Sequence, residues 1–131
     1  MTAAEEVQAA ADALVAAFAR SDAETYFACF AEDATFVFHT EPRRLESRQE
    51  YQQLWGRWVA EDDFRVVSCA SSGPRVQVLG DAAVFTHDVA TVVATAAGEA
   101  ASNERETIVF VRTEQGWRAA HEHLSAAPGD D

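Results

Sequence analysis

The amino-acid sequence predicts one α+β domain, with most of its helices first and antiparallel strands after them. Three Ser/Thr-x-x-Glu motifs occur in the first 50 residues, and each precedes apolar residues at helical spacing. Runs rich in β-branched residues, separated by turn residues, fill most of the remainder. Helices laid across one face of a curved sheet would form a cone with an apolar interior, which is a natural ligand pocket.

Three helices are predicted from capping boxes, in which side chains satisfy the free N–H groups of a first helical turn. The boxes pair Thr2 with Glu5, Ser21 with Glu24, and Ser47 with Glu50. Apolar stripes follow each box at helical spacing, and their members are Val7, Leu14, Val15, Phe18; Tyr26, Phe27, Phe30; and Tyr51, Leu54, Trp55, Trp58. We interpret these stripes as core-facing surfaces.

Six runs are predicted as strands, at residues 34–39, 64–71, 74–80, 82–94, 104–113 and 117–125. A Ser-Gly-Pro break separates the second run from the third, a longer loop spans residues 95–103, and a tight turn spans residues 114–116. The predicted domain covers residues 1–126. Residues 127–131 are expected to form a mobile tail.

The composition argues against several classes of partner. The net charge is −12, from 22 acidic and 10 basic residues, and no basic stripe exists that could bind nucleic-acid phosphates. An anionic membrane surface would repel the chain, and no apolar run approaches the ~18 residues of a membrane span. Cys29 and Cys69 lie in apolar surroundings without a metal-binding or redox spacing, so we expect free thiols in a cytoplasmic protein.

Alternation along the last strands sorts their side chains onto two faces. The turn at 114–116 pairs residue 113 with 117 and 109 with 121, and the longer loop pairs residue 88 with 108. The odd face then includes His87, Val109, Trp117, His121 and His123, and the even face includes Thr86, Asp88, Glu106, Ile108, Phe110, Glu122 and Leu124. Both faces are largely apolar, so one is expected to line the pocket and the other to form a subunit interface.

Two groups of side chains are candidates for chemistry. No carboxylate shares the odd face with the histidines of these strands, so we interpret them as hydrogen-bonded core or interface residues and expect no metal site. If the even face lines the pocket, burial and mutual repulsion would raise the pKa of at least one of Asp88, Glu106 and Glu122 and produce a general acid or base. The alternative is a solvated position at the rim, or pairing with Arg118. No cofactor motif occurs.

Several segments together resemble a known family. They are "SDAETYFACFAEDATFVF", "LW" at 54–55, "VLGDAA", and "RETIVFVRTEQGWRAAHEHLSAAPG". The series resembles the SnoaL-like group of the nuclear transport factor 2-like superfamily, and within it the association (hub) domain of calcium/calmodulin-dependent kinase II and its stand-alone bacterial relatives. The resemblance covers nearly the whole chain and is most specific at Trp117, His121, His123, Ser125, Ala127 and Pro128. It implies a cystatin-like cone of N-terminal helices on a strongly curved antiparallel sheet, dimeric or larger.

The resemblance also assigns the faces. The hub family's pocket arginines fall at Asp88, Ile108 and Leu124 of this sequence, so the even face should line the pocket and the odd face should build the assembly. None of these three positions is arginine, which replaces the cationic hub pocket with an acidic one. Phe38 falls where related ketosteroid isomerases place their catalytic aspartate, so their chemistry is not expected here.

Two hypotheses follow. The first is a small-molecule-binding protein and acid–base enzyme, of the cyclase, isomerase, dehydratase or epoxide hydrolase type, acting on a neutral or cationic, largely apolar substrate. Asp88 and Glu106 would be catalytic, in a pocket lined by Tyr26, Phe30, Phe36, Phe38, Trp55, Trp58, Thr86, Ile108, Phe110, Glu122 and Leu124. The second is a non-catalytic homo-oligomeric module like a kinase hub. Its interface, a homodimer or larger, would contain His87, Val109, Trp117, His121 and His123.

Overall fold

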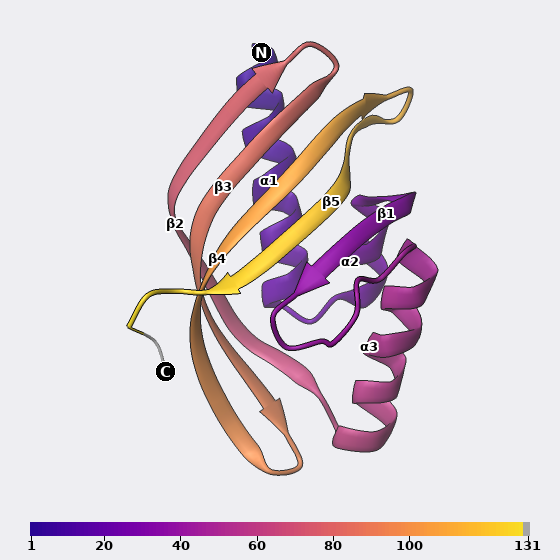
Figure 1. Cartoon of the computed structure of the whole chain (residues 1–131), viewed down its shortest axis with the longest axis vertical. Helices are drawn as coiled ribbons and strands as arrows, with labels where there is room; N and C mark the ends of the chain where they lie inside the picture. The colour runs from indigo at the N-terminus through magenta and orange to yellow at the C-terminus, as the bar shows by residue number, and fades with distance from the viewer. Residues whose placement is uncertain (130–131) are drawn as a thin grey trace.

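The computed structural model describes residues 1–129, and it consists of three helices and one curled five-stranded sheet (Figure 1). The elements, in chain order, are α1 (Ala3–Ala19), α2 (Ala23–Ala28), β1 (Phe30–Phe38), α3 (Arg48–Asp62), β2 (Arg65–Leu79), β3 (Ala82–Thr95), β4 (Gly98–Thr113) and β5 (Gly116–Ala126). The strand order is β1-β5-β4-β3-β2, and β1 is parallel to β5 whereas the other neighbours are antiparallel. The predicted α+β cone is therefore confirmed.

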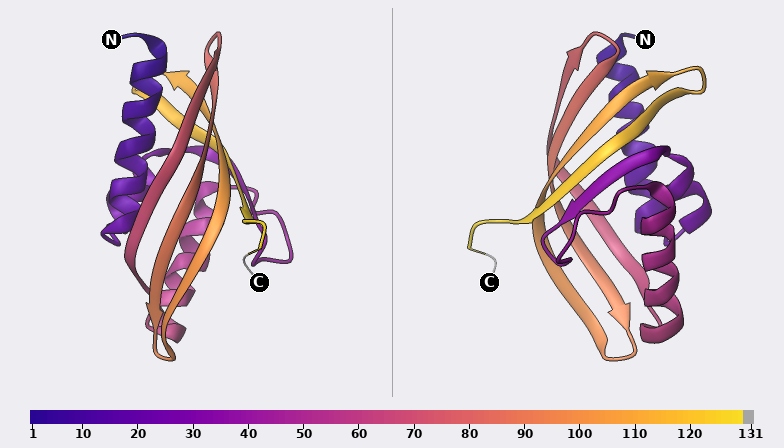
Figure 2. Two further views of the ribbon diagram at one scale, coloured as in Figure 1. Left: turned by 90° about the vertical axis from the view of Figure 1, so that its left-hand side faces the viewer. Right: turned by 45° about the vertical axis from the view of Figure 1, so that its right-hand side comes forward.

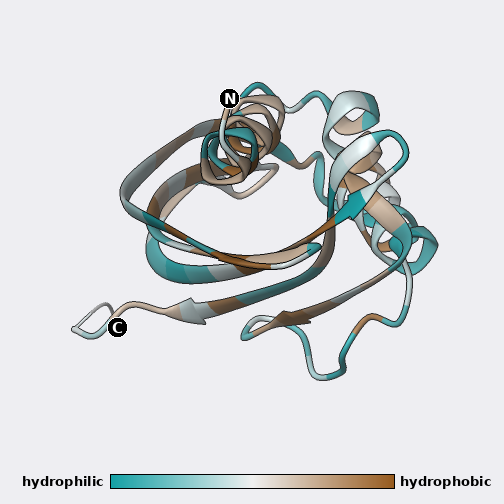
Figure 3. Ribbon diagram, turned by 90° about the horizontal axis from the view of Figure 1, so that it is seen from above, coloured by the Kyte–Doolittle hydropathy of each residue, from teal (hydrophilic) through white to brown (hydrophobic). Residues whose placement is uncertain are grey.

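The helices lie on the concave side of the sheet, which bends toward them at both ends (Figures 2 and 3). α1 packs mainly against β2, and α3 packs against β1. Val7, Ala11 and Leu14 form the buried stripe of α1. No helix within residues 1–129 is both long enough and apolar enough to cross a bilayer.

Two of the three predicted caps form as expected, and one is displaced. Thr2 and Glu5 make a complete capping box at α1, and the Ser47 side chain accepts a hydrogen bond from the Glu50 N–H at α3. At α2 the cap is Asp22, whose carboxylate accepts from the Thr25 N–H. The predicted Ser21 cap is wrong because Ser21 takes a left-handed backbone conformation, with φ of 59°, and its hydroxyl accepts from the Val66 N–H instead.

The strands are longer than the sequence predicts. β2 runs without interruption through Gly73 and Pro74, because a register shift there absorbs the residues expected to break it. β4 begins at Gly98 and replaces most of the predicted loop at 95–103. At the end of the chain the Ala127 N–H bonds the Asn103 carbonyl at 3.0 Å, and residues 130–131 of the predicted tail lie outside the described part of the chain.

The short β3–β4 turn reverses the predicted faces of β3. Thr95 pairs directly with Gly98, so His87 lies opposite Glu106, and the odd residues of β3 share a face with the even residues of β4. From Ala83 to Thr91 the buried residues of β3 are accordingly odd-numbered, and they face the helices. Thr86 and Asp88 lie on the outer face, and the prediction that they line a pocket is wrong.

A bulge in β5 divides the strand into two parts with different registers against β4. The residues after the bulge pair as predicted, and the residues before it do not. Trp117 pairs with Arg112 and Ala119 with Phe110, after which Ala120 is an extra residue and His121 pairs with Val109. Trp117 is therefore an inward residue, 7% exposed, and its indole N–H donates to Glu6 of α1 at 3.2 Å. The prediction that Trp117 is an interface residue is wrong for this reason. His121 and His123 remain on the outer face with Val109.

Candidate active site

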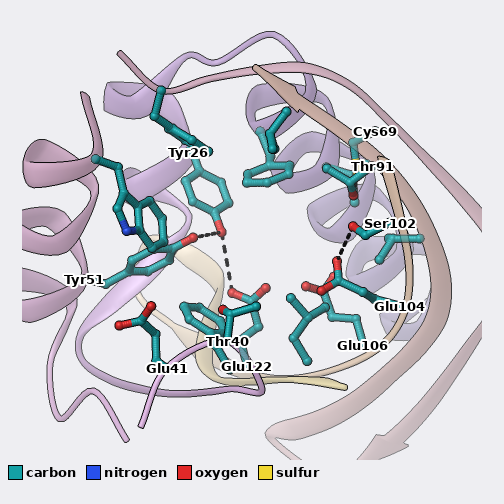
Figure 4. Close-up of a pocket in the computed structure, with 18 of the residues that line it drawn as sticks. Tyr26, Thr40, Glu41, Tyr51, Cys69, Thr91, Ser102, Glu104, Glu106 and Glu122 are labelled. Carbon is teal, nitrogen blue, oxygen red and sulfur yellow. Dashed lines mark hydrogen bonds between the residues drawn. The ribbon is translucent and has the colours of Figure 1, made fainter. Parts of the chain in front are cut away.

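A cavity of about 370 Å³ lies between the concave face of the sheet and the helices (Figure 4). Its walls are mainly apolar and aromatic, with contributions from Leu14, Val15, Phe18, Tyr26, Phe38, Tyr51, Trp58, Phe64, Val89, Val93 and Leu124. Its polar lining consists of Thr40, Glu41, Asp62, Cys69, Thr91, Thr95, Ser102, Glu104, Glu106 and Glu122. A space of this volume with mainly apolar and aromatic walls is typical of a small-molecule site.

Two carboxyl groups, Glu106 of β4 and Glu122 of β5, lie next to each other in the wall of this cavity. They converge because Ile108 pairs with Glu122 and Glu106 with Leu124, which places both acids on the inner face of adjacent strands. Glu122 is only 3% exposed. Burial, followed by the charge of Glu106, raises the pKa of Glu122 well above its ordinary value, so Glu122 is the protonated partner.

Glu106 is the ionised partner of the pair. Burial alone would raise its pKa, but the neighbouring Glu122, followed by the hydrogen bond and the charge of His87, outweighs burial and leaves the pKa of Glu106 below its ordinary value. The His87 Nε2 lies 2.6 Å from Glu106 Oε1, and the His87 Nδ1 lies 2.6 Å from the Ser71 hydroxyl. A neutral acid and a charged base thus stand side by side in one cavity.

Two tyrosines approach the carboxyl pair from the helices. The hydroxyls of Tyr26 and Tyr51 lie 3.0 Å apart, and Tyr26 donates to Glu122 Oε1 over 3.5 Å. Burial is the main cause that raises the pKa of both phenols well above 10, so both keep their protons and serve as hydrogen-bond donors or acceptors. Their rings pack edge to face, with centroids 6.0 Å apart, which fixes the hydroxyls toward the acids.

A third acid stands apart from this pair. Glu104 Oε2 is 2.6 Å from His39 Nε2, and the Ser102 hydroxyl donates to Glu104 Oε1 over 3.4 Å. The Glu104 side chain is 10% exposed and that of His39 is 35% exposed, so this pair lies nearer to solvent. His39 directly precedes Thr40, an exposed residue of the cavity lining. Within residues 1–129, no three His, Cys, Asp or Glu side chains are arranged to hold a metal ion.

The structure brings together some of the residues predicted for the site. Those that line the cavity are Tyr26, Phe38, Trp58, Glu106, Glu122 and Leu124. Those that pack in the core without lining it are Phe30, Phe36, Trp55, Ile108 and Phe110. Asp88, the first predicted catalytic residue, is exposed on the outer face, and the prediction is wrong because the β3–β4 register differs by an odd number of residues.

His87, predicted at a subunit interface, is instead wholly buried inside the domain. Sequence reasoning also missed Glu104, which is the first residue of the predicted strand 104–113 and was not named as a candidate. Tyr51 was interpreted only as core, although its hydroxyl reaches the Tyr26 hydroxyl. The pairing of Thr95 with Gly98, closed over Ala96 and Ala97, sets the register that buries His87. Ala-Ala lacks the glycine or asparagine that marks such a turn in a sequence.

The Glu122→Gln variant is expected to gain stability relative to the wild type as pH rises. A raised pKa means that folded Glu122 keeps a proton that the unfolded chain loses above about pH 4.3. The resulting stabilisation is complete below that pH and is lost as pH rises toward the folded pKa, by about 1.4 kcal/mol per pH unit. Glutamine has the same shape and no proton to lose.

Urea unfolding of the Glu122→Gln variant and the wild type, from acidic to mildly alkaline pH, checks this. Glu114→Gln, in the exposed turn before β5, is the control and should track the wild type. A constant difference between Glu122→Gln and the wild type at every pH would show that Glu122 has no raised pKa.

Several solved structures share the fold of this chain. Its structure is similar to an NTF2-like superfamily protein from Salmonella enterica (16% identity, 97% of this chain and 95% of that chain covered, TM-score 0.81). It is also similar to a CaMKII hub from S. rosetta (21% identity, 97% and 98% covered, TM-score 0.76). A protein of unknown function with a cystatin-like fold from Nostoc punctiforme is a third neighbour (16% identity, 95% and 90% covered, TM-score 0.69).

These likenesses in structure establish the fold. Among curated proteins, none matches the chain. The model of the SnoaL-like domain matches residues 7–129, which is nearly the whole chain. The chain therefore belongs to the SnoaL-like domain family.

Proposed function

We propose that this protein is an acid–base enzyme that binds a small, largely apolar, neutral or cationic molecule in its cavity. The observation that supports it is the buried carboxyl pair on adjacent strands, in which the pKa of Glu122 is raised and that of Glu106 is lowered. Neighbouring groups whose pKa values are pushed in opposite directions supply an acid and a base at the same pH. Such a pair suits an isomerase, cyclase, dehydratase or epoxide hydrolase.

The carboxyl pair can complete one catalytic cycle without a net gain or loss of protons. The Glu106 carboxylate takes a proton from a carbon or hydroxyl group of the substrate, and the Glu122 carboxyl gives its proton to a substrate oxygen. The Tyr26 hydroxyl stabilises the Glu122 carboxylate that results, since it already donates to this group. The proton gained by Glu106 then passes to the neighbouring Glu122 carboxylate, which restores the starting state.

The charge of the lining supports the substrate class. Of the described residues that line the cavity, none is arginine or lysine, whereas five are acidic. An anionic substrate would meet the Glu106 carboxylate without a basic side chain in the wall, and like charges in a site of low dielectric repel strongly. A neutral or cationic group meets no such penalty, and the aromatic walls bind its apolar part.

A general-base probe tests the proposal. 5-Nitrobenzisoxazole is a neutral, flat compound in which removal of the C3 proton by a base breaks the N–O bond and releases a coloured nitrile phenolate. Wild-type protein at pH 7 should accelerate this reaction over the same buffer containing acetate at equal carboxylate concentration. A rate equal to that of acetate would count against the enzyme proposal.

A matched ligand panel tests the charge preference. Thermal shift with a neutral aromatic, its amine analogue and its carboxylate analogue should show stabilisation by the first two alone. A ligand at a hundred times its dissociation constant adds about 2.7 kcal/mol, which is readily measured. Stabilisation by the carboxylate alone would overturn the proposed substrate class.

A second candidate function, self-association, has its own support in the outer face of the sheet. No helix within residues 1–129 covers this face, and half-buried Val84, Val109 and Val111 lie on it beside His121. The CaMKII hub of S. rosetta has the same fold. We propose a homodimer or larger assembly through this face, which leaves the cavity on the opposite face free.

The assembly is expected to weaken as pH falls below about 6.5, the ordinary pKa of histidine. Burial, and then the charge of His123, lowers the pKa of His121, so the folded face favours the neutral ring and acid adds an unfavourable charge. Light scattering at pH 7.5 and at pH 5 measures this. Val109→Arg should give a monomer at both pH values. Val78→Arg, on the edge strand β2, should leave the molar mass of the assembly unchanged. A wild-type monomer at pH 7.5 would refute self-association.

A further inference from the structure

His87 lies behind the carboxyl pair and contacts one of its members. Its side chain is completely buried and does not line the cavity. It spans three strands, because its Nδ1 is 2.6 Å from Ser71 Oγ on β2 and its Nε2 is 2.6 Å from Glu106 Oε1 on β4. Both ring nitrogens are therefore occupied by one partner each.

The two bonds fix the tautomer. Ionised Glu106 is an acceptor only, so Nε2 carries the proton that it donates to Glu106. In the neutral ring, the Ser71 hydroxyl donates to the Nδ1 lone pair, which holds the proton of the ring on Nε2. Ser71 is exposed on the edge strand, and its hydroxyl is the outer end of this chain of hydrogen bonds.

The two acids differ in the hydrogen-bond donors that reach them. Both lie in one cavity wall, but each contacts a different donor. Glu106 receives the Nε2–H of His87 at 2.6 Å, whereas the phenol of Tyr26 reaches Glu122 only at 3.5 Å. A short bond to a charged acceptor is the stronger of the two.

The other titratable groups that face the pair do not favour an ionised Glu106. Within residues 1–129 they are Glu104 on β4, Cys69 on β2, Tyr26 on α2 and Tyr51 on α3. All are acids or neutral donors, and α1 contributes only apolar side chains to the cavity. His87 is the basic side chain that contacts Glu106.

We propose that His87, held by Ser71, is the positioning residue that makes Glu106 the base and Glu122 the acid of the pair. The catalytic consequence rests on the proposed function. The location of the proton does not, because it is a property of the folded protein and can be measured without a substrate.

A titration of the glutamate carboxyls by NMR, with ¹³C at Cδ, tests the proposal. Spectra of Glu106→Gln and Glu122→Gln assign the two signals. In His87→Phe, which keeps an aromatic ring and removes the donor, the pKa of Glu106 should rise by about 1 to 2 units, the value of a hydrogen bond to a charged group. His87→Gln, whose amide can donate in place of Nε2–H, should restore most of the wild-type titration.

The matched control is His123→Gln, on the exposed outer face of β5, which should leave both signals unchanged. If His87→Phe does not fold, Ser71→Ala takes its place, with a smaller rise expected in the same direction. An unchanged Glu106 titration in the folded variant overturns the proposal.

Turnover separates this inference from the proposed function. If 5-nitrobenzisoxazole is converted, the acidic limb of the rate–pH profile should shift to higher pH in His87→Phe, by the same amount as the pKa of Glu106. A wild type that titrates as expected but gives no turnover would refute the enzyme and leave the role of His87 intact. If turnover occurs but the acidic limb of the rate–pH profile does not shift with the pKa of Glu106, His87 is not the residue that makes Glu106 the base.

Discussion

Glu106→Gln is expected to lower kcat/KM for 5-nitrobenzisoxazole by at least about 100-fold, the lower end of what a general base contributes. The amide keeps the size of the side chain, and its oxygen can still accept from His87 Nε2, which lies 2.6 Å from the Glu106 carboxylate. It cannot take up a proton. The loss should therefore appear in turnover at pH 7, while the thermal unfolding midpoint changes little.

Asp88→Asn is the matched control for the loss of a carboxylate. Asp88 was the first catalytic candidate in the sequence, but it is exposed on the outer face of β3. Its variant should retain wild-type turnover. If Asp88→Asn lost activity and Glu106→Gln kept it, the cavity would not be the reaction site.

Phe36→Ala is expected to destabilise the fold by about 3 to 5 kcal/mol, the cost of removing a buried aromatic ring. The Phe36 side chain is 0% exposed, and its ring centroid lies 4.7 Å from that of Tyr51 and 5.1 Å from that of Phe30. No neighbouring chain segment can collapse into the space without moving these rings. Urea unfolding measures the loss.

Leu79→Ala is the control for Phe36→Ala. Leu79 is 64% exposed at the end of β2, so its truncation should change stability by no more than about 0.5 kcal/mol. A Phe36→Ala protein as stable as Leu79→Ala would mean that the aromatic cluster around Tyr51 does not pack as described.

The sequence predicts the helices well because their signals are local. The Thr2 box and the Ser47 cap need only residues within one turn, and both helices begin where these side chains place them. Ser21 fails for a non-local reason, since its hydroxyl binds the Val66 N–H, 45 positions away along the chain. The extent of β2 was missed because a bulge accommodates Gly73 and Pro74.

The candidate site was predictable only in part, since its faces depend on strand register. Glu106 and Glu122 were placed on one face correctly because the β5 bulge restores the pairing of Val109 with His121. Asp88 and His87 lie on the faces opposite to those predicted, because the β3–β4 turn is shorter than expected. A register error of an odd number of residues inverts every side chain of a strand, and composition cannot reveal it when both faces are apolar.

The Ala120 bulge suggests how domains of this kind diversify. Each residue of β5 that follows the bulge pairs as it would if Ala120 were absent, so deletion of this residue would leave Glu122 opposite Ile108. What would change is the bend of the strand, because an unpaired residue in a ladder increases local curvature and twist. Insertion or loss of single residues at such points would enlarge or shrink the cavity in evolution while its acids stay in place. Pocket size and pocket chemistry would then be inherited as separate traits.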